Sequence, residues 1–215
     1  MLFLTDFADL GLVLPLTGLV ALSLAAVGKL REALAWSVVV TGTFATMLLL
    51  KVLIFACVDA DIGDGLGLRN PSGHTAAGVV VYAGLLTLIG ERFGPRVPIA
   101  FLAGAGFGLI FGSTRLMLRF HTLQDVLVGG AVGLIGVLVL AKLAGPRRPD
   151  VPASGHVIVA AVALLGVLTH HGHRLDAEVE LRSIAAMVRF GERRPPAEAP
   201  RPVSRPPARP AVATQ

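Results

Sequence analysis

The stretch Leu123-Gln-Asp-Val-Leu-Val-Gly-Gly-Ala-Val-Gly-Leu-Ile-Gly-Val-Leu-Val-Leu-Ala-Lys-Leu143 decides the fold of this chain. Its charged residues, Asp125 and Lys142, stand close to its two ends, and the residues between them are apolar. A helix of about 20 apolar residues is long enough to cross the hydrocarbon core of a bilayer. The stretch therefore predicts a transmembrane helix.

Five further apolar runs accompany this segment. They cover residues 8–27, 34–57, 74–92, 97–114 and 151–170. The chain of 215 residues is 54% hydrophobic and 15% charged, and its mean hydropathy is +0.74, which is too apolar for a soluble domain. We predict an all-α polytopic membrane protein with six transmembrane helices in a bundle.

Small residues recur at four-residue spacing within two of the runs. They are Gly104, Gly108 and Gly112 in one run, and Gly129 and Gly133 in the other. Such spacing lets helix backbones approach closely in lipid, although glycine is also simply frequent in membrane helices. We expect close helix packing at these positions.

The composition excludes several classes of function. The net charge of +5 does not indicate a nucleic-acid partner, because eight of the 19 lysines and arginines follow residue 173. One tryptophan and one tyrosine provide no aromatic platform for bases. The single cysteine, Cys57, excludes an internal disulfide and a multi-cysteine metal site.

Charged residues between the runs predict the orientation. One side collects the basic residues Lys29, Arg31, Arg92, Arg96, Lys142, Arg147 and Arg148. The other side collects Asp6, Asp9, Asp59, Asp61 and Asp64, together with Arg69, Arg115 and Arg119. The positive-inside rule places the first side in the cytoplasm, and the acidic N-terminal flank argues against a cleaved signal peptide. We expect a protein of a bacterial inner membrane whose second side faces the periplasm.

The C-terminal region divides into two parts. Residues 174–190 place apolar and charged residues on opposite sides of a helix, which predicts an amphipathic helix on the membrane surface or against the bundle. Residues 191–215 hold seven prolines and five arginines without an apolar period, which predicts a disordered tail. Its basic residues either contact anionic lipid or a partner, or are simply solvated, which we favour.

The motif Pro71-Ser72-Gly73-His74 stands where the third apolar run begins. Ser72 is a good helix N-cap, and Gly73 lets a ligand approach the backbone. The N–H groups of a first helical turn bind anions, helped by the positive end of the helix dipole. His74 would lie beside such an anion, although a simple N-cap with an interfacial histidine would give the same pattern.

A second motif runs from Arg115 to Asp125 and joins the fourth run to the fifth. His121 and Asp125 are four residues apart, so they share a face if the helix has already begun. A carboxylate that accepts the hydrogen of one imidazole nitrogen leaves the other nitrogen free to attack. Arg115 supplies a planar fork for phosphate oxygens, whereas Arg119 either assists or extends toward lipid headgroups, which we favour.

Lys51 is an ionisable residue inside the second apolar run, and such residues are functional candidates by default. It lies about 10 Å from the outer end of its helix by the helical rise. It either extends to the interface or points its ammonium into the bundle beneath the anion site. The residues on the same side that could bind a phosphate favour the second arrangement.

Together these residues resemble the signature of the type 2 phosphatidic acid phosphatase superfamily. That signature reads K-x6-R-P, then P-S-G-H, then S-R-x5-H-x3-D. The matching positions of this chain are Lys51, Pro71, Ser72, Gly73, His74, Arg115, His121 and Asp125.

The chain departs from this signature in two places. Thr114 replaces the serine before Arg115 and keeps the hydroxyl. Val58 and Asp59 stand where the signature has Arg-Pro. Arg69, close to the first histidine motif, is our candidate for the missing guanidinium.

The resemblance implies that residues 1–173 form a transmembrane phosphatase domain. It implies that His121 is the nucleophile and forms a phosphohistidine, and that Asp125 orients it. His74 would protonate the leaving oxygen and then deprotonate the attacking water. The phosphate oxygens would be held by Lys51, Ser72, Gly73 and Arg115, with Arg69 as the added candidate. Fixed cations and amides would replace a metal, so neither a metal nor a cofactor is expected.

The sequence also holds a histidine cluster, His170-His171-Gly172-His173, which could bind a metal. It lacks a matching set of carboxylates or cysteines, so an interfacial polar cluster is the better interpretation.

Three functions fit the sequence. The first is an integral-membrane phosphatase acting on a lipid phosphate or diphosphate monoester. The second is a phosphotransferase of the same superfamily, in which an acceptor alcohol replaces water. The third is a non-catalytic membrane protein that retains the motifs, because the Arg-Pro is missing. Prenyl diphosphate, phosphatidate, phosphatidylglycerol phosphate and lipid A all remain open as the lipid.

Overall fold

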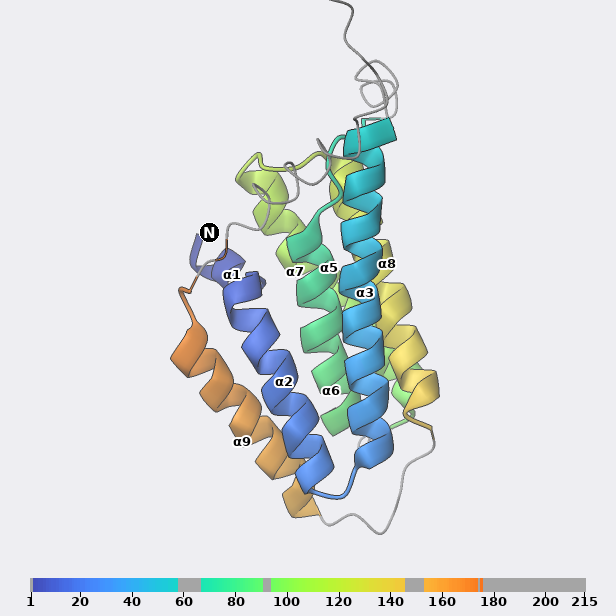
Figure 1. Ribbon diagram of the computed structural model, residues 1–215, viewed down its shortest axis with the longest axis vertical. Coiled ribbons are helices and arrows are strands. Elements are labelled where there is room, and N and C mark those ends of the chain that lie inside the picture. Colours follow the sequence, from blue (N-terminus) through green and yellow to red (C-terminus); the bar gives the residue numbers. More distant parts are fainter. Residues whose placement is uncertain (1, 58–66, 91–93, 146–152, 174, 176–215) are drawn as a thin grey trace, which may run out of the picture.

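The computed structural model describes residues 2–57, 67–90, 94–145, 153–173 and 175 (Figure 1). These residues form a helical bundle, and the expected all-α class is confirmed. Its helices are α1 (Leu2–Asp6), α2 (Leu10–Ala26), α3 (Leu30–Cys57), α5 (Gly73–Gly78), α6 (Gly84–Ile89), α7 (Arg96–Met117), α8 (Leu123–Leu143) and α9 (Ala153–His170). The predicted amphipathic helix and disordered tail lie outside the described residues, apart from Leu175.

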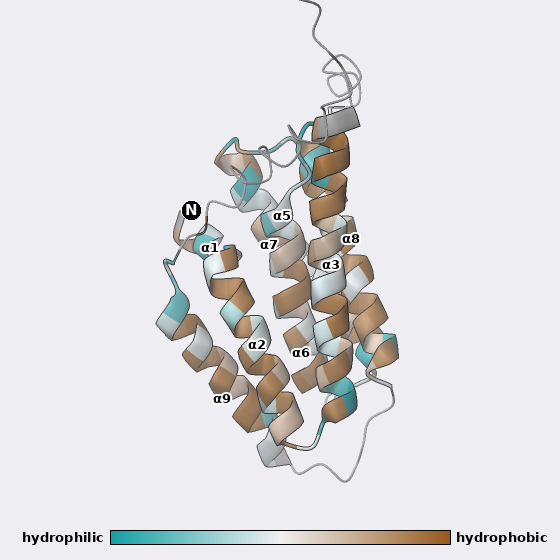
Figure 2. Cartoon of the chain, viewed as in Figure 1, coloured by the Kyte–Doolittle hydropathy of each residue, from teal (hydrophilic) through white to brown (hydrophobic). Residues whose placement is uncertain are grey.

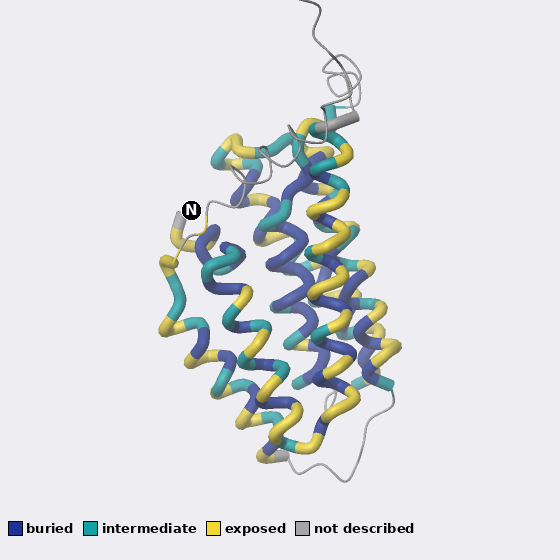
Figure 3. The backbone as a smooth tube through the Cα atoms, in the orientation of Figure 1, coloured by how far each residue is buried: buried dark blue, intermediate teal, exposed yellow. Residues whose placement is uncertain are grey.

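Helices α5 and α6 are parts of one continuous helix. A π-helical turn, η1 (Val79–Ala83), joins them without a break. This helix runs through the centre of the bundle and is buried over most of its length (Figure 3). The π turn adds one residue to a helical turn, and such insertions are common near functional sites.

Within the described residues, three helices are long and apolar enough to cross a membrane: Leu30–Phe55 within α3, α7 and α8. The other apolar helices, Leu10–Ala26, Gly73–Ile89 and Ser154–His170, are shorter. These six helices correspond to the six predicted runs, and the number of membrane crossings stays a prediction. Figure 2 shows apolar residues along the helices and hydrophilic residues toward their ends. Large side chains such as Leu22, Leu109 and Leu168 remain exposed, as suits a surface in contact with lipid.

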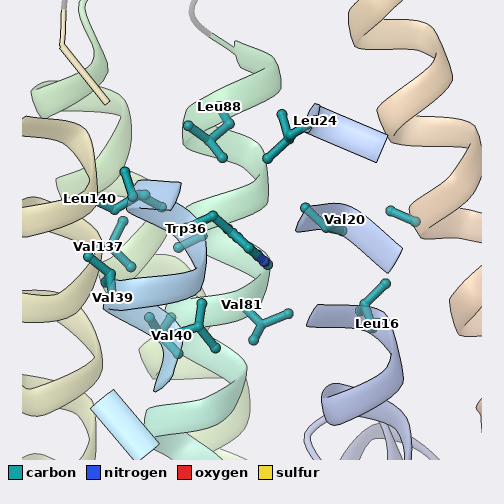
Figure 4. Close-up of a cluster of buried hydrophobic side chains, with 14 of the residues drawn as sticks. Leu16, Val20, Leu24, Trp36, Val39, Val40, Val81, Leu88, Val137 and Leu140 are labelled. Carbon is teal, nitrogen blue, oxygen red and sulfur yellow. The ribbon is translucent and has the colours of Figure 1, made fainter. Parts of the chain in front are cut away.

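The core of the bundle is centred on Trp36 of α3, which is fully buried (Figure 4). Aliphatic side chains of α2, the central helix and α8 lie around it, among them Leu16, Val20, Val81 and Leu140. The indole Nε1 donates to the carbonyl oxygen of Thr17 at 3.1 Å, so its one polar atom is satisfied. The tryptophan thereby ties α3 to α2.

Close packing is confirmed at four of the five spaced glycines. A Cβ at Gly104 would lie 2.5 Å from Leu134, and one at Gly112 would lie 2.6 Å from Val126. At Gly133 it would lie 2.8 Å from the carbonyl oxygen of Ala76, and at Gly129 it would clash with that of Ser72. A Cβ at Gly108 would make only an ordinary contact, 3.7 Å from Val79. The contacts of Gly129 and Gly133 bring α8 directly against the backbone at the start of the central helix.

The described basic residues of one predicted side gather at one end of the bundle. Lys29 donates from Nζ to Nε2 of His156 at 2.8 Å. Arg96 pairs with the buried Glu32, with Nη2 and Oε1 3.3 Å apart. Arg31 donates from Nε to the carbonyl oxygen of Leu143 at 2.9 Å. These contacts fix the helix ends opposite the two histidine motifs; Arg92, Arg147 and Arg148 lie outside the described residues.

Candidate active site

The first motif forms the start of the central helix. Ser72 is fully buried and caps this helix, since its Oγ accepts the N–H of Thr75 at 3.3 Å. Its own N–H donates to the carbonyl oxygen of Asp125 at 2.9 Å. Gly73 and His74 follow in the first turn, whose N–H groups are suited to an anion.

The end of α7 holds Arg115 in place. Arg119 has a left-handed backbone conformation, with φ of 55°. Its N–H donates to the carbonyl oxygen of Leu116 at 3.0 Å. The N–H of Phe120 donates to the carbonyl oxygen of Arg115 at 3.1 Å. This pair of bonds is the Schellman motif that terminates many helices. It turns the Phe120 ring over the guanidinium, with Cζ of Arg115 4.9 Å from the ring centroid. Arg115 is consequently buried and held from one side.

The start of α8 explains the spacing of the second motif. Thr122 is the N-cap, and its Oγ1 accepts the N–H of Asp125 at 3.2 Å. In return, Oδ2 of Asp125 accepts the N–H of Thr122 at 3.0 Å. This reciprocal pair is a capping box, so one role of Asp125 is to stabilise the start of α8.

The other carboxylate oxygen of Asp125 holds the first motif. Oδ1 accepts the N–H of Arg69 at 3.1 Å and that of Asn70 at 2.8 Å. Thr122 adds a further bond from its Oγ1 to the carbonyl of Gly67 at 2.7 Å. The two motifs therefore form one assembly, in which residues 67–72 dock on the start of α8.

His121 lies inside this assembly. Its Nδ1 is 2.9 Å from the carbonyl oxygen of Asn70 and 3.9 Å from Oδ2 of Asp125. Since a carbonyl can only accept, Nδ1 carries the hydrogen and Nε2 keeps its lone pair. We expected the carboxylate to accept this hydrogen directly, whereas Asn70, which the sequence did not single out, is the closer acceptor. Asp125 acts on His121 through the loop that it holds.

Lys51 and Arg115 bring positive charge to the histidines. Lys51 is buried, and a Cβ at Gly73 would lie 3.6 Å from its Cε and 3.9 Å from its Nζ. The ammonium therefore lies against the first turn of the central helix, as expected. Burial, together with the charges of Arg115 and Lys51, lowers the pKa of His121 below its ordinary value. His121 is thus a neutral imidazole at neutral pH.

His74 has a partner that the sequence did not reveal. Its Nε2 lies 3.6 Å from Oδ2 of Asp9, the N-cap of α2. The charge pattern placed Asp9 on the same side of the membrane as the two motifs, but nothing in the local pattern linked it to the Pro-Ser-Gly-His motif.

The remaining candidates contribute less to this cluster. Arg69 is exposed and joins the assembly through its backbone N–H. The hydroxyl of Thr114 donates to the carbonyl of Phe111 at 2.7 Å, so it serves its own helix. Val58 and Asp59 lie outside the described residues.

The histidine cluster after α9 packs against α1. The ring of His171 contacts those of Phe3 and Phe7, with centroids 4.6 and 4.5 Å away. Among the residues that the structure describes, no three histidine, cysteine or carboxylate side chains come together as metal ligands.

Comparison with known families identifies the superfamily of this chain. A family model described as the PAP2 superfamily matches residues 33–149, which is more than half of the chain. The chain belongs to the PAP2 superfamily. Members of this superfamily are generally phosphatases, so membership indicates hydrolysis of a phosphoester. The match runs from α3 to beyond α8 and leaves Asp9 outside it. No curated protein and no solved structure matches the chain significantly.

Proposed function

We propose that this chain is an integral-membrane phosphatase that hydrolyses a lipid phosphate or diphosphate monoester through a phosphohistidine. One observation carries the proposal. The Nδ1 hydrogen of His121 is bound to Asn70, which leaves the Nε2 lone pair beside the cations Lys51 and Arg115. Attack on phosphorus requires a neutral imidazole beside positively charged groups that bind the phosphate, and these residues provide both.

In the first step, Nε2 of His121 forms a bond to phosphorus as the bond from phosphorus to the leaving oxygen breaks. The electron pair of that bond stays on the leaving oxygen, which takes a proton from His74. Lys51, Arg115 and the N–H groups that follow Ser72 stabilise the negative charge on the non-bridging oxygens. Arg69 reaches the headgroup from the loop.

In the second step, a water molecule attacks the phosphohistidine. His74 accepts a proton from this water, and the nitrogen–phosphorus bond breaks with its electron pair returning to Nε2 of His121. Inorganic phosphate leaves, and both histidines regain their starting states. The cations and amide groups of the site supply the charge stabilisation, so we expect full activity in the presence of a chelator.

The setting of the site favours a lipid as the substrate. The histidines lie at one end of a bundle whose outer faces carry exposed leucines and valines, so the site faces the headgroup region of a membrane. Lys29, Arg31 and Arg96 lie at the opposite end, and the positive-inside rule supports a cytoplasmic location for that end. The site then opens to the periplasmic side of a bacterial inner membrane.

The test uses the full chain in detergent micelles with four substrates: a prenyl diphosphate, phosphatidate, phosphatidylglycerol phosphate and lipid A. Released phosphate identifies a hydrolase, and transfer to an added alcohol would identify a phosphotransferase instead. Acid-labile, base-stable labelling of wild-type protein, absent from His121→Ala, identifies the phosphohistidine. Turnover by His121→Ala above a few per cent of wild type would overturn the mechanism.

A further inference from the structure

We propose that Asp9 positions His74 and stabilises the protonated imidazole that donates to the leaving oxygen. This role rests on the function proposed above, and it assigns to the site a residue that lies outside the family match. Asp9 would be a positioning residue, since it acts on the substrate only through His74.

The contact between these residues is direct. Nε2 of His74 and Oδ2 of Asp9 are 3.6 Å apart, which is within the distance of an ion pair. The carboxylate side chain is 9% exposed, whereas the imidazole is 29% exposed. The histidine is therefore covered on the side of Asp9 and open on another side, from which a headgroup can approach.

Asp9 is itself held in place before any substrate arrives. Its Oδ1 accepts the N–H of Gly11 and the N–H of Leu175, each at 2.9 Å. Burial raises the pKa of Asp9, but the contact with His74 and these two N–H groups outweigh that effect and leave the pKa below its ordinary value. Asp9 is consequently a fixed negative charge, with Oδ1 used for its own anchoring and Oδ2 directed at His74.

The surrounding charges show why His74 needs this partner. Burial disfavours a positive charge on His74, and the charges of Arg115 of α7 and Lys51 of α3 disfavour it further. Asp125 of α8 is engaged by the N–H groups of Thr122, Arg69 and Asn70. Within the part of the chain that the structure describes, Asp9 is the carboxylate in ion-pair contact with His74. A general acid in this cationic site needs such a counter-charge to hold its proton.

The contact also selects the nitrogen that meets the substrate. Because Nε2 faces the carboxylate, Nδ1 is left to donate to the leaving oxygen and later to accept from water. A carboxylate that holds one nitrogen of an imidazole fixes both the tautomer and the ring plane. Asp9 and His74 therefore act as a pair, whereas the nucleophile His121 depends on a backbone carbonyl.

A purely structural role for Asp9 makes a different prediction. As the N-cap of α2, Asp9 is replaceable by asparagine, which caps helices equally well. Asp9→Asn keeps an oxygen for Gly11 and removes the negative charge beside His74. The variant thus distinguishes the role of Asp9 as a helix cap from its role as a negative charge beside His74.

The experiment measures the first turnover of the full chain in micelles with two substrates. Dodecyl phosphate has a poor leaving group that needs a proton, whereas nitrophenyl phosphate has a good leaving group that does not. We expect Asp9→Asn to slow phosphoenzyme formation about 10- to 100-fold with dodecyl phosphate and less than about threefold with nitrophenyl phosphate. Asp9→Glu, which keeps the charge, should recover part of the loss.

Asp6→Asn is the matched control, because it makes the same change in the same segment. It should leave the ratio of the two rates unchanged. Equal losses on both substrates, or no loss with dodecyl phosphate, would overturn the role of Asp9 while leaving the phosphatase intact. A wild-type protein that turns over neither substrate nor any lipid of the panel would overturn the proposed function and this inference together.

Discussion

The Nδ1 of His121 is bound to the backbone carbonyl of Asn70, at 2.9 Å. The loop that presents this carbonyl is fastened by Asp125, whose Oδ1 accepts the N–H of Asn70 at 2.8 Å. The orientation of the nucleophile is therefore relayed: the carboxylate fixes the loop, and the loop fixes the imidazole. A side chain can act on a catalytic group without being its nearest partner.

Asp125→Asn should lower kcat about 100-fold while KM changes little. The amide keeps one accepting oxygen, so it can serve either Thr122 or the loop, and His121 loses its fixed orientation. Steady-state kinetics with a lipid phosphate check this expectation. Gln124→Ala, at an exposed position in the same turn, is the control. A wild-type kcat for Asp125→Asn would show that the relay is dispensable.

Gly129→Ala should reduce kcat/KM more than tenfold, because the added methyl group clashes with the carbonyl of Ser72 and pushes α5 away from α8. Overpacking of this kind costs about 1–3 kcal/mol of stability. Gly130→Ala should be tolerated, since its Cβ would lie 3.8 Å from Thr75, an ordinary contact. Kinetics and thermal unfolding in detergent compare the pair. Equal behaviour of the two variants would contradict the close approach.

The pH dependence of His121 follows from its lowered pKa. The imidazole is protonated and inert below this pKa and becomes a nucleophile as the pH rises through it, so its reactivity should reach half its maximum below pH 6.5. The rate of modification by diethyl pyrocarbonate in the absence of substrate, with His121→Ala as the blank, measures this midpoint. A midpoint above 6.5 would mean that burial and the charges of Arg115 and Lys51 do not lower the pKa of the ring.

Arg69→Ala should raise KM and weaken kcat/KM about tenfold, because an exposed guanidinium on the loop can meet the headgroup at the mouth of the site. The backbone N–H that binds Asp125 is unaffected by this change, so the measured loss belongs to the guanidinium. Arg69→Lys should recover only part, since lysine lacks the bidentate fork. A small loss that disappears at high salt would assign Arg69 to surface charge balance instead.

Arg119→Gly should stabilise the protein by about 0.5–1 kcal/mol. Arg119 has a φ of 55°, a conformation that strains a residue with a Cβ but not glycine. Relief of this strain exceeds the additional chain entropy that glycine brings to the unfolded state. Unfolding in detergent measures the difference, with Arg119→Ala as the control that keeps the Cβ. A loss of stability in the glycine variant would place the strain elsewhere.

Much of the fold was predictable because lipid-spanning helices are long and apolar. The run 123–143 coincides with α8, and each other run falls on a helix. The first run was less accurate, since the structure has a short α1 and begins α2 only after Asp9. The cap on Asp9 sets that boundary, and hydropathy alone does not detect caps. The π turn was not predictable either. Val79–Ala83 is a run of mostly apolar residues, so its hydropathy is the same whether the turn is α-helical or π-helical.

The candidate site was predictable where side-chain identity carries the chemistry. Lys51, His74, Arg115 and His121 were found from their residue types and spacing, and the structure brings them together. The role of Asn70 escaped prediction because a backbone carbonyl is present at every residue. Asp9 escaped because its contact with His74 depends on how α2 packs against the central helix, which no local pattern reports.

The π-helical turn of the central helix has a consequence for the direction of His74. A π turn accommodates one residue more than an α turn, so the segments before and after Val79–Ala83 keep about the register of an α-helix that is one residue shorter. The same residues in uniform α-helical geometry would rotate His74 by about 100° around the helix axis relative to Gly84–Ile89. The side of the helix on which His74 stands therefore depends on the backbone geometry of an apolar segment that carries none of the motif residues.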